Sequence, residues 1–335
     1  NGTATVPFFI LIPKSIMNGE APYPARILQF GHGFFGSREE AAEDFMASFA
    51  NETGMITVAC DWWGMAEIDR EMLIVQLATT PEDGLNFTQR THQSFANFIS
   101  LGEAALKTIP SLPECTDDKG VSYLDPSELY FYGISQGHIL GGVYTALSPH
   151  IKQSALSVGG GAFSMLIPRA EPFIPLRALL IGGMEGRIDV ERYLSTGLAA
   201  MDHIDGIAFR RFVFDAPLEG SPTNRRVVMH VGIGDTQVPN LATHLHARAL
   251  GLKLLEPSPR TVAGFDTVTS PYNGSAMVEF DFDIEEPNKI PVGFAVDNGV
   301  HGKVRRLPAA VQQLNQFFQP EGPIVHTCDG ACDPE

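Results

Sequence analysis

The sequence predicts an α/β protein built on a doubly wound, mostly parallel sheet. Short, apolar, β-rich segments alternate along the chain with longer segments of helical periodicity. Glycine-rich turns carrying polar side chains follow several predicted strands, where function collects in such sheets. The chain has 335 residues, of which 44% are hydrophobic. This is enough for one large domain with an insertion, or for two modest domains.

The first elements are three strands and a helix. Apolar, β-rich runs predict strands at residues 4–13, 26–30 and 55–61. Between the last two, Ser37 is followed by acidic residues, which is typical of a helix start. Gly54 predicts the end of that helix.

The middle of the chain continues the alternation. Apolar side chains at helical spacing predict a long helix at residues 89–108. Residues 128–134 then form a short apolar strand pattern, and a helical pattern follows as far as Leu147. The next predicted strand, residues 153–158, ends in three glycines.

Residues 162–223 interrupt this alternation. They are rich in Met, Leu, Phe and Pro and contain no clear strand. We interpret them as a mainly helical cap inserted into a core formed by residues 1–161 and 224–335. The alternative is that they are ordinary connecting helices of the core.

The last part of the chain returns to the core pattern. Strands are predicted at residues 226–231 and 276–283, with a helix at residues 240–250 between them. A final helix is predicted at residues 305–318. No internal repeat is visible.

Ser135 lies where a predicted strand turns sharply into a helix. The local sequence is Gly133-Ile134-Ser135-Gln136-Gly137, so the positions two before and two after the serine lack side chains. Such a crowded turn lifts the serine hydroxyl out of the sheet, close to the positive end of the helix. Ser135 is therefore a candidate nucleophile. The alternative is a tight turn whose serine only caps the helix.

A serine nucleophile needs a base and an acid that orients the base. Among ten histidines we favour His301, which lies in a glycine-flanked loop before the last helix. Asp235 is the favoured acid, because it follows a predicted strand within Gly234-Asp235-Thr236. Asp297 is the rival acid and Asp61 a weaker one. Of the other histidines, His138 and His230 are expected within a helix and a strand, and His244 and His246 on the surface.

An acyl-transfer site also needs donors for the developing oxyanion. The backbone N–H of Gln136, at the helix start, is one candidate. The backbone N–H of Phe34, in the turn that begins at His32, is the other, and His32 is expected to brace this turn. A flexible loop is the alternative interpretation of residues 31–36.

Composition narrows the partners. The formal net charge of −16 argues against nucleic acid and anionic membranes as main partners. No apolar run is long enough to span a bilayer. Because the sequence opens at Asn1 without a signal peptide, we expect a processed, secreted form, extracellular or periplasmic. The oligomeric state is not predicted.

The four cysteines add one prediction. Cys328 and Cys332 flank a glycine-containing turn in the C-terminal tail, and a local disulfide between them would suit an oxidising compartment. A metal clip with Asp329 and Asp333 is less favoured, because the spacing fits no usual zinc or calcium loop.

The four site segments together resemble the serine esterase and lipase branch of the α/β-hydrolase superfamily. They are HGFFG at 32–36, GISQG at 133–137, GDTQVP at 234–239 and GVHG at 299–302. Their order, serine then acid then histidine, is that of the superfamily, and the resemblance covers essentially the whole chain. It implies acyl-enzyme chemistry carried by Ser135, His301 and Asp235. The gap between the acid and the histidine is longer than usual, which indicates an extra segment near residues 254–271.

The expected function is hydrolysis of carboxylic esters, as in a carboxylesterase or lipase, without cofactor or metal. A small-molecule or lipid-like ester would be the substrate. The residues expected to contact it are Phe35, Trp62, Trp63 and Phe163, although plain core packing is the alternative. A serine peptidase of the same fold and a catalytically inactive binding module are the other functions considered.

Overall fold

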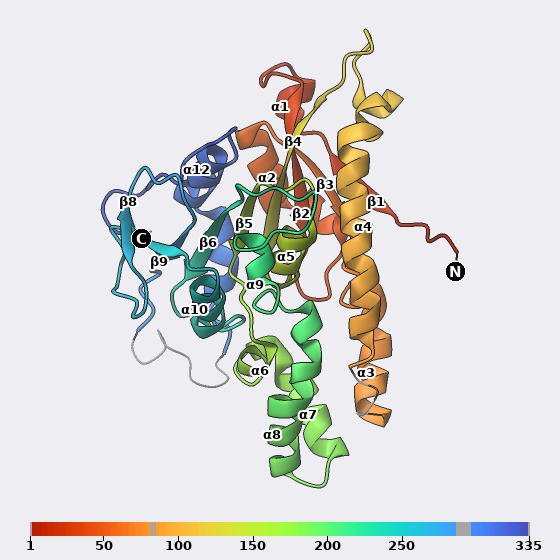
Figure 1. Cartoon of the computed structure of the whole chain (residues 1–335), viewed down its shortest axis with the longest axis vertical. Coiled ribbons are helices and arrows are strands. Elements are labelled where there is room, and N and C mark those ends of the chain that lie inside the picture. Colours follow the sequence, from red (N-terminus) through yellow and green to blue (C-terminus); the bar gives the residue numbers. More distant parts are fainter. Residues whose placement is uncertain (1, 81–82, 84, 286–295, 334–335) are drawn as a thin grey trace.

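A nine-stranded sheet forms the centre of the molecule (Figure 1). The computed structural model describes residues 2–80, 83, 85–285 and 296–333. Within these residues the strand order is β1-β3-β2-β4-β5-β6-β9-β7-β8; β1 runs antiparallel to β3, and the other neighbouring pairs are parallel. The strands are β1 (Phe8–Leu11), β2 (Ala25–Gly31), β3 (Ile56–Cys60), β4 (Leu124–Ile134), β5 (Gln153–Ser157), β6 (Arg226–Gly232), β7 (Lys253–Glu256), β8 (Thr267–Thr269) and β9 (Ala276–Phe280).

Helices cover both faces of this sheet, as predicted (Figure 1). Outside residues 162–223 these are α1 (Lys14–Met17), α2 (Asp44–Thr53), α3 (Arg70–Thr79), α4 (Phe87–Lys107), α5 (Gln136–Leu147), α10 (Asn240–Ala249), α11 (Val300–Lys303) and α12 (Pro308–Phe317). Short 3-10 turns extend several of them: Arg38–Ala42, Glu67–Asp69, Ile109–Ser111, Pro113–Cys115 and Val304–Arg306.

The alternation of side chains along the strands produces two separate cores. On one face, Ile27, Val58 and Phe131 pack with residues of α4 and α5. On the other face, Leu28 and Tyr132 pack with residues of α2 and α12. Both faces of the central strands are therefore buried, which is why they read as continuous apolar runs rather than as alternating patterns.

The segment between the acid and the histidine holds two strands that the sequence patterns missed. Strand β7 pairs with β9, and β8 pairs with β7 at the edge of the sheet. Both are short, so their periodicity is weak. The extra segment expected near residues 254–271 is thus an extension of the sheet.

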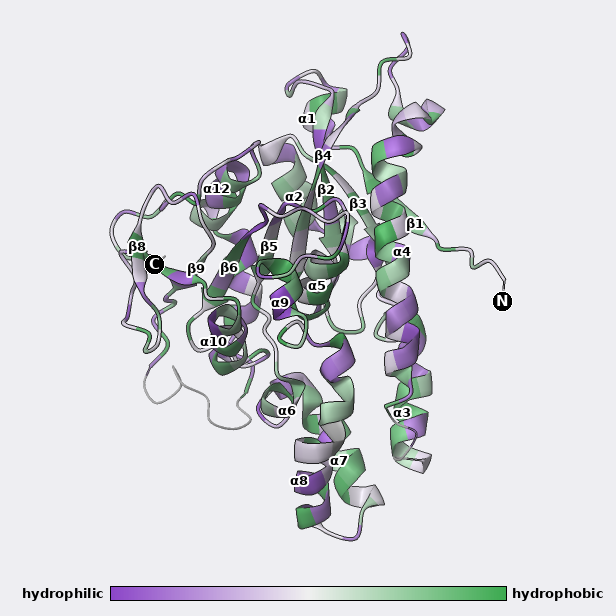
Figure 2. Ribbon diagram, viewed as in Figure 1, coloured by the Kyte–Doolittle hydropathy of each residue, from purple (hydrophilic) through white to green (hydrophobic). Residues whose placement is uncertain are grey.

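Residues 162–223 lie between β5 and β6 and are helical within the described chain. They contain α6 (Phe163–Leu166), α7 (Ile174–Gly183), α8 (Arg187–Thr196) and α9 (Arg210–Val213), with 3-10 turns at Glu171–Phe173 and Gly197–Ile204. Helices α7 and α8 extend away from the sheet at the bottom of Figure 1, and α3 packs against α7. Figure 2 shows α7 as mostly hydrophobic and α8 as more mixed. The division into core and cap stays a prediction.

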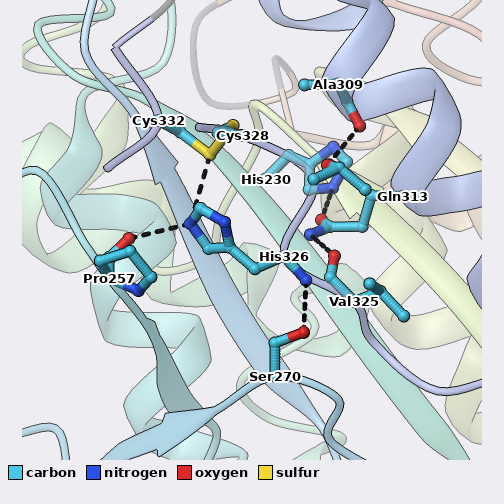
Figure 3. Close-up of a disulfide and its surroundings, with 10 residues drawn as sticks. His230, Pro257, Ser270, Ala309, Gln313, Val325, His326, Cys328 and Cys332 are labelled. Atoms are coloured by element: carbon cyan, nitrogen blue, oxygen red, sulfur yellow. Dashed lines mark hydrogen bonds between the residues drawn. A yellow bond between two sulfur atoms is a disulfide. The ribbon is translucent and has the colours of Figure 1, made fainter. Parts of the chain in front are cut away.

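The C-terminal tail contains a local disulfide between Cys328 and Cys332, as the sequence predicted (Figure 3). Their Cα atoms are 5.3 Å apart. The Cys332 carbonyl accepts a hydrogen bond of 2.8 Å from the N–H of Asp281, directly after β9. The ring of His326 lies beside Cys332 and hydrogen-bonds the Pro257 carbonyl at 3.0 Å.

A helix able to cross a bilayer would need a long apolar stretch. None of the helices in the described part of the chain combines the required length and hydropathy.

Candidate active site

Ser135 occupies a strained turn between β4 and α5. Its backbone has φ 59° and ψ −119°, a region that L-residues with side chains rarely adopt. The turn is held by a 2.9 Å hydrogen bond from the Ser135 N–H to the Ser157 carbonyl on β5. A strained backbone costs free energy and persists only where the surrounding structure holds it. Such residues cluster at functional sites, so the strain at Ser135 favours a functional role.

Two glycines make this turn possible. A Cβ at position 133 would lie 2.0 Å from the Gly137 carbonyl oxygen. A Cβ at position 137 would lie 2.0 Å from the carbonyl oxygen of Gly31, at the end of β2. Since both obstacles are backbone atoms that cannot rotate away, neither position accepts a side chain.

His301 and Asp235 lie together at the same edge of the sheet. His301 is on α11, Asp235 follows β6, and both side chains are almost fully buried. His301 Nδ1 donates a hydrogen bond of 2.8 Å to Asp235 Oδ2. The other carboxylate oxygen of Asp235 accepts from the N–H groups of Gln237 and Val238 at 2.9 and 3.1 Å. These hydrogen bonds fix the orientation of the carboxylate. Because Nδ1 of His301 donates to it, Nε2 is the ring nitrogen that could accept a proton.

Two asparagines hold the acid loop. Asn240 donates to the Gly232 carbonyl at 2.7 Å and accepts from the Gly234 N–H at 3.0 Å. Asn298 donates to the Gly234 carbonyl at 2.8 Å, which ties the histidine loop to the acid loop. Neither asparagine was singled out from the sequence, because their partners are backbone atoms of other segments.

An ion pair between Arg260 and Glu279 contacts Asn240. Glu279 on β9 accepts two hydrogen bonds of 2.8 Å from the guanidinium of Arg260. The same guanidinium donates to Asn240 Oδ1 at 3.3 Å. Arg260 belongs to the extra segment between β7 and β8, so this segment supports the acid loop from outside.

The two rival acids have other partners. Asp297 is exposed and accepts hydrogen bonds from the side chain of Gln237 at 3.2 Å and from the N–H of Gly299 at 3.0 Å. Asp61 is paired with Arg38 at 2.6 Å. Of the three carboxylates, Asp235 is the one in contact with His301.

The turn at residues 32–36 is fixed rather than flexible. His32 Nε2 accepts a 2.8 Å hydrogen bond from the Trp62 N–H, and its Nδ1 bonds the Gly33 carbonyl at 2.9 Å. Burial lowers the pKa of His32 to about 4, so the ring is neutral at pH 7. This is the bracing role that the sequence predicted for His32.

Glu40 fixes the same turn from the other side. Its carboxylate accepts a 3.0 Å hydrogen bond from the Gly33 N–H, and burial raises its pKa. Among the backbone hydrogen bonds of the described residues, none uses the N–H of Phe34 or Gln136. Both predicted oxyanion donors are therefore available to a ligand.

A cavity of about 290 Å³ brings these segments together. Ser135, His301, Phe34 and Gln136 all line it. Within the described chain no hydrogen bond joins Ser135 Oγ to His301. Catalytic hydrogen bonds are often long without substrate and tighten when it binds, so the shared cavity is the informative observation. We call this the site cavity.

The residues expected to contact substrate divide into two groups. Phe163 lines the site cavity. Trp62 does not: it is fully buried and stacks on Phe98 with ring centroids 3.5 Å apart. Trp63 lies under the guanidinium of Arg90, and Phe35 is also outside the cavity lining. For Trp62 the alternative, core packing, holds, because α4 covers this tryptophan where it follows β3.

Several residues of the cavity were missed. Glu40 and Glu43 line it from the segment between β2 and α2, and Arg305 lines it from the 3-10 turn that follows α11. In the sequence the two glutamates resemble acidic residues at a helix start, and the arginine resembles a basic residue on the surface. No local pattern distinguishes a charged residue that faces a cavity from one that faces water. The lining of the cavity thus combines charged side chains with apolar ones such as Phe173 and Leu166.

One prediction about the histidines is wrong. His246, expected on the surface, is fully buried and accepts a 3.1 Å hydrogen bond from Nε2 of His138. Burial lowers the pKa of both rings, that of His246 to about 4. The described residues include no group of three or more His, Cys, Asp or Glu side chains that could hold a metal ion.

Comparison with known proteins places the fold. No protein-family model matches this sequence, and no curated protein matches it. Acetyl xylan esterase 1 from Thermoanaerobacterium sp. aligns with 94% of this chain and 80% of its own, at 13% identity and a TM-score of 0.50.

Two further solved structures are similar at lower scores. Pyrococcus horikoshii acylaminoacyl peptidase aligns with 97% of this chain at 10% identity and a TM-score of 0.49, and this chain spans 40% of its length. Est1E from Butyrivibrio proteoclasticus, solved with ferulic acid bound, aligns with 92% of this chain and 93% of its own, at 14% identity and a TM-score of 0.45.

The protein has the α/β-hydrolase fold. The mostly parallel sheet with helices on both faces, the order of the strands and the strained serine after a central strand agree with this assignment. At this level of identity the comparison establishes the fold, and function has to be argued from the site.

Proposed function

We propose that this protein is a serine hydrolase that cleaves carboxylic esters, with Ser135 as nucleophile, His301 as general base and Asp235 as the orienting acid. The observation that supports this most is the buried 2.8 Å contact between His301 and Asp235, at the wall of the cavity that Ser135 also lines. A strained serine, a histidine and a buried carboxylate at one sheet edge are the parts that acyl transfer requires.

In the proposed cycle, Ser135 Oγ attacks the ester carbonyl while His301 Nε2 takes the hydroxyl proton. Asp235 holds the imidazole through Nδ1 and stabilises the imidazolium that forms. The N–H groups of Phe34 and Gln136 stabilise the tetrahedral oxyanion. His301 then protonates the leaving alcohol. In the second half of the cycle His301 takes a proton from the water that attacks the acyl-enzyme, and returns it to Ser135 Oγ as the acid leaves.

A serine peptidase is the second candidate. Glu40 and Glu43 line the site cavity, and carboxylates there could bind the ammonium group of a peptide. Arg305 lines the same side and opposes part of that charge. Matched ester and anilide substrates with the same acyl group separate the two candidates, because a peptidase cleaves both and an esterase strongly prefers the ester.

We further propose that the protein works in an oxidising compartment. The Cys328–Cys332 disulfide supports this, because such bonds persist outside the reducing cytosol. Cell fractionation followed by thiol labelling of the native protein tests it. We expect the protein in an exported fraction, with Cys328 and Cys332 unreactive toward the thiol reagent. Recovery in the cytosol with free thiols would contradict the proposal.

The proposed chemistry is tested with p-nitrophenyl acetate and the variant Ser135→Ala. We expect turnover by the native protein and loss of at least about 10³-fold in the variant, because the nucleophile is absent. Circular dichroism and thermal unfolding provide the folding control. Equal turnover in the folded variant would rule out Ser135 as the nucleophile.

A further inference from the structure

A second cavity lies beside the site cavity and is lined almost entirely by apolar side chains. It has a volume of about 60 Å³. Leu73 and Leu77 on α3, Leu176 and Leu180 on α7, and Leu194 on α8 face it. We call it the apolar cavity. It lies between the helical segment 162–223 and the α3–α4 region.

The apolar cavity adjoins the site cavity. Phe34, Met65 and Phe173 line both cavities. The rings of Phe34 and Phe173 are 4.9 Å apart, so they form one wall between the two spaces. The Gln136 side chain donates a 3.0 Å hydrogen bond to the Met65 carbonyl, which fixes this wall to the residue that follows Ser135.

The mechanism indicates which part of the substrate would occupy the apolar cavity. His301 must protonate the leaving alcohol, so the alcohol lies on the histidine side, where Gln237 and Arg305 provide polar groups. The acyl group stays on Ser135, with its carbonyl oxygen toward the oxyanion donors. Because Phe34 carries one of these donors and also lines the apolar cavity, the cavity is on the acyl side.

We propose that the apolar cavity binds the acyl chain of the substrate, and that the substrates are esters of unbranched aliphatic acids of medium length. This inference rests on the proposed serine hydrolase function and adds the substrate class. A volume of about 60 Å³ has room for roughly four to five groups the size of a methylene. Chains of about six carbons would therefore fill it, counting the carboxyl carbon and its neighbour in the site cavity.

The test compares kcat/KM for p-nitrophenyl acetate, butyrate, hexanoate and decanoate in the native protein. Each methylene taken up by the apolar cavity should increase kcat/KM by roughly fourfold, since burial of one methylene favours binding by that factor. We expect a rise from acetate to hexanoate and no further rise at decanoate.

Two variants at one position change the cavity in opposite directions. Leu176→Trp fills it and should lower the ratio of kcat/KM for hexanoate to kcat/KM for acetate to about one. Leu176→Ala enlarges it and should move the preference toward longer chains. Ile181→Trp is the matched control, because Ile181 is on the same helix but exposed at 38%, outside the cavity.

The outcomes separate the inference from the proposed function. Acetate turnover without any dependence on chain length, or a hexanoate advantage unchanged in folded Leu176→Trp, would overturn the acyl-chain inference alone. Failure of the native protein to cleave any of the esters, together with no fluorophosphonate label on Ser135, would overturn the proposed function and the inference with it.

Discussion

The edge of the sheet that carries Ser135 and the apolar cavity beneath α7 and α8 are built in different ways. At the sheet edge, hydrogen bonds and close backbone contacts fix each group, as in the 2.8 Å contact between His301 and Asp235. In the apolar cavity, contacts between Leu, Phe and Met side chains of separate helices define the space. Hydrogen bonds are directional and apolar contacts are not, so the two regions should respond differently to mutation.

The largest effect is expected from an isosteric change at the sheet edge. Asp235→Asn keeps the shape of the side chain but removes its charge and favours the wrong tautomer of His301. We expect kcat to fall by about 10⁴-fold with p-nitrophenyl acetate. Asp297→Asn is the matched control, since Asp297 contacts Gln237 rather than His301, and it should stay within about threefold. A larger loss in Asp297→Asn than in Asp235→Asn would show that Asp297, and not Asp235, has the role of the acid.

A smaller effect is expected one step away from the chemistry. Asn240→Ala removes both side-chain contacts to the backbone of the acid loop, so Asp235 is no longer held in place. We expect kcat to fall by up to about 10²-fold with little change in KM, because misplacement of about 1 Å has that consequence. His244→Gln, which alters the outer contact to Glu279 and leaves Asn240 in place, should keep kcat close to native. Equal losses in the two variants would point to a general structural effect.

The apolar region should show the opposite behaviour. Leu194→Ala removes a buried side chain from the apolar cavity wall, so the free energy of unfolding should fall by about 2–3 kcal/mol. The kcat/KM for p-nitrophenyl acetate should stay within about twofold, since acetate does not reach that wall. Chemical denaturation and steady-state kinetics on the same sample measure both quantities. A loss of acetate turnover larger than tenfold in the folded variant would contradict the separation of the two regions.

The smallest effect concerns pH and lies outside both regions. Burial lowers the pKa of His230 to about 4, below the value near 6.5 of an unfolded histidine. The unfolded chain therefore binds more protons, and the free energy of unfolding decreases as pH falls from about 6.5 toward 4. For this one group the loss at pH 5 is on the order of 2 kcal/mol.

The variant His230→Gln isolates this contribution. His230 Nε2 donates to Gln313 at 2.8 Å (Figure 3), and a glutamine does not titrate. Thermal unfolding between pH 7 and 5 should show a weaker dependence on pH in the variant than in the native protein, whatever the offset at pH 7. Parallel curves would show that His230 titrates normally in the folded state.

The sequence predicted the parts of the molecule that follow local rules. Glycines at positions 133 and 137 indicated the strained turn, because only a residue without Cβ fits against a neighbouring carbonyl oxygen. The central strands were recognisable as apolar runs buried on both faces. Asp235 and His301 were singled out because each lies next to a glycine in a loop after a predicted strand, and the two side chains are in contact.

The remaining features depend on contacts between distant segments. Trp62 and His246 are buried by helices far away in the sequence, so their burial has no local signal. Strands β7 and β8 are short and exist through pairing with β9 and with each other. The side chains that enclose the apolar cavity come from three separate helices, and the periodicity of each helix shows only that it has an apolar face.

The central claim is that Ser135 is activated by His301. Intact-mass analysis after brief treatment with a fluorophosphonate tests this most directly, because such reagents react with activated serines. We expect one label per chain, located on Ser135, and at least about 10³-fold slower labelling in folded His301→Gln. Labelling of another residue, or an unchanged rate in the variant, would contradict the claim.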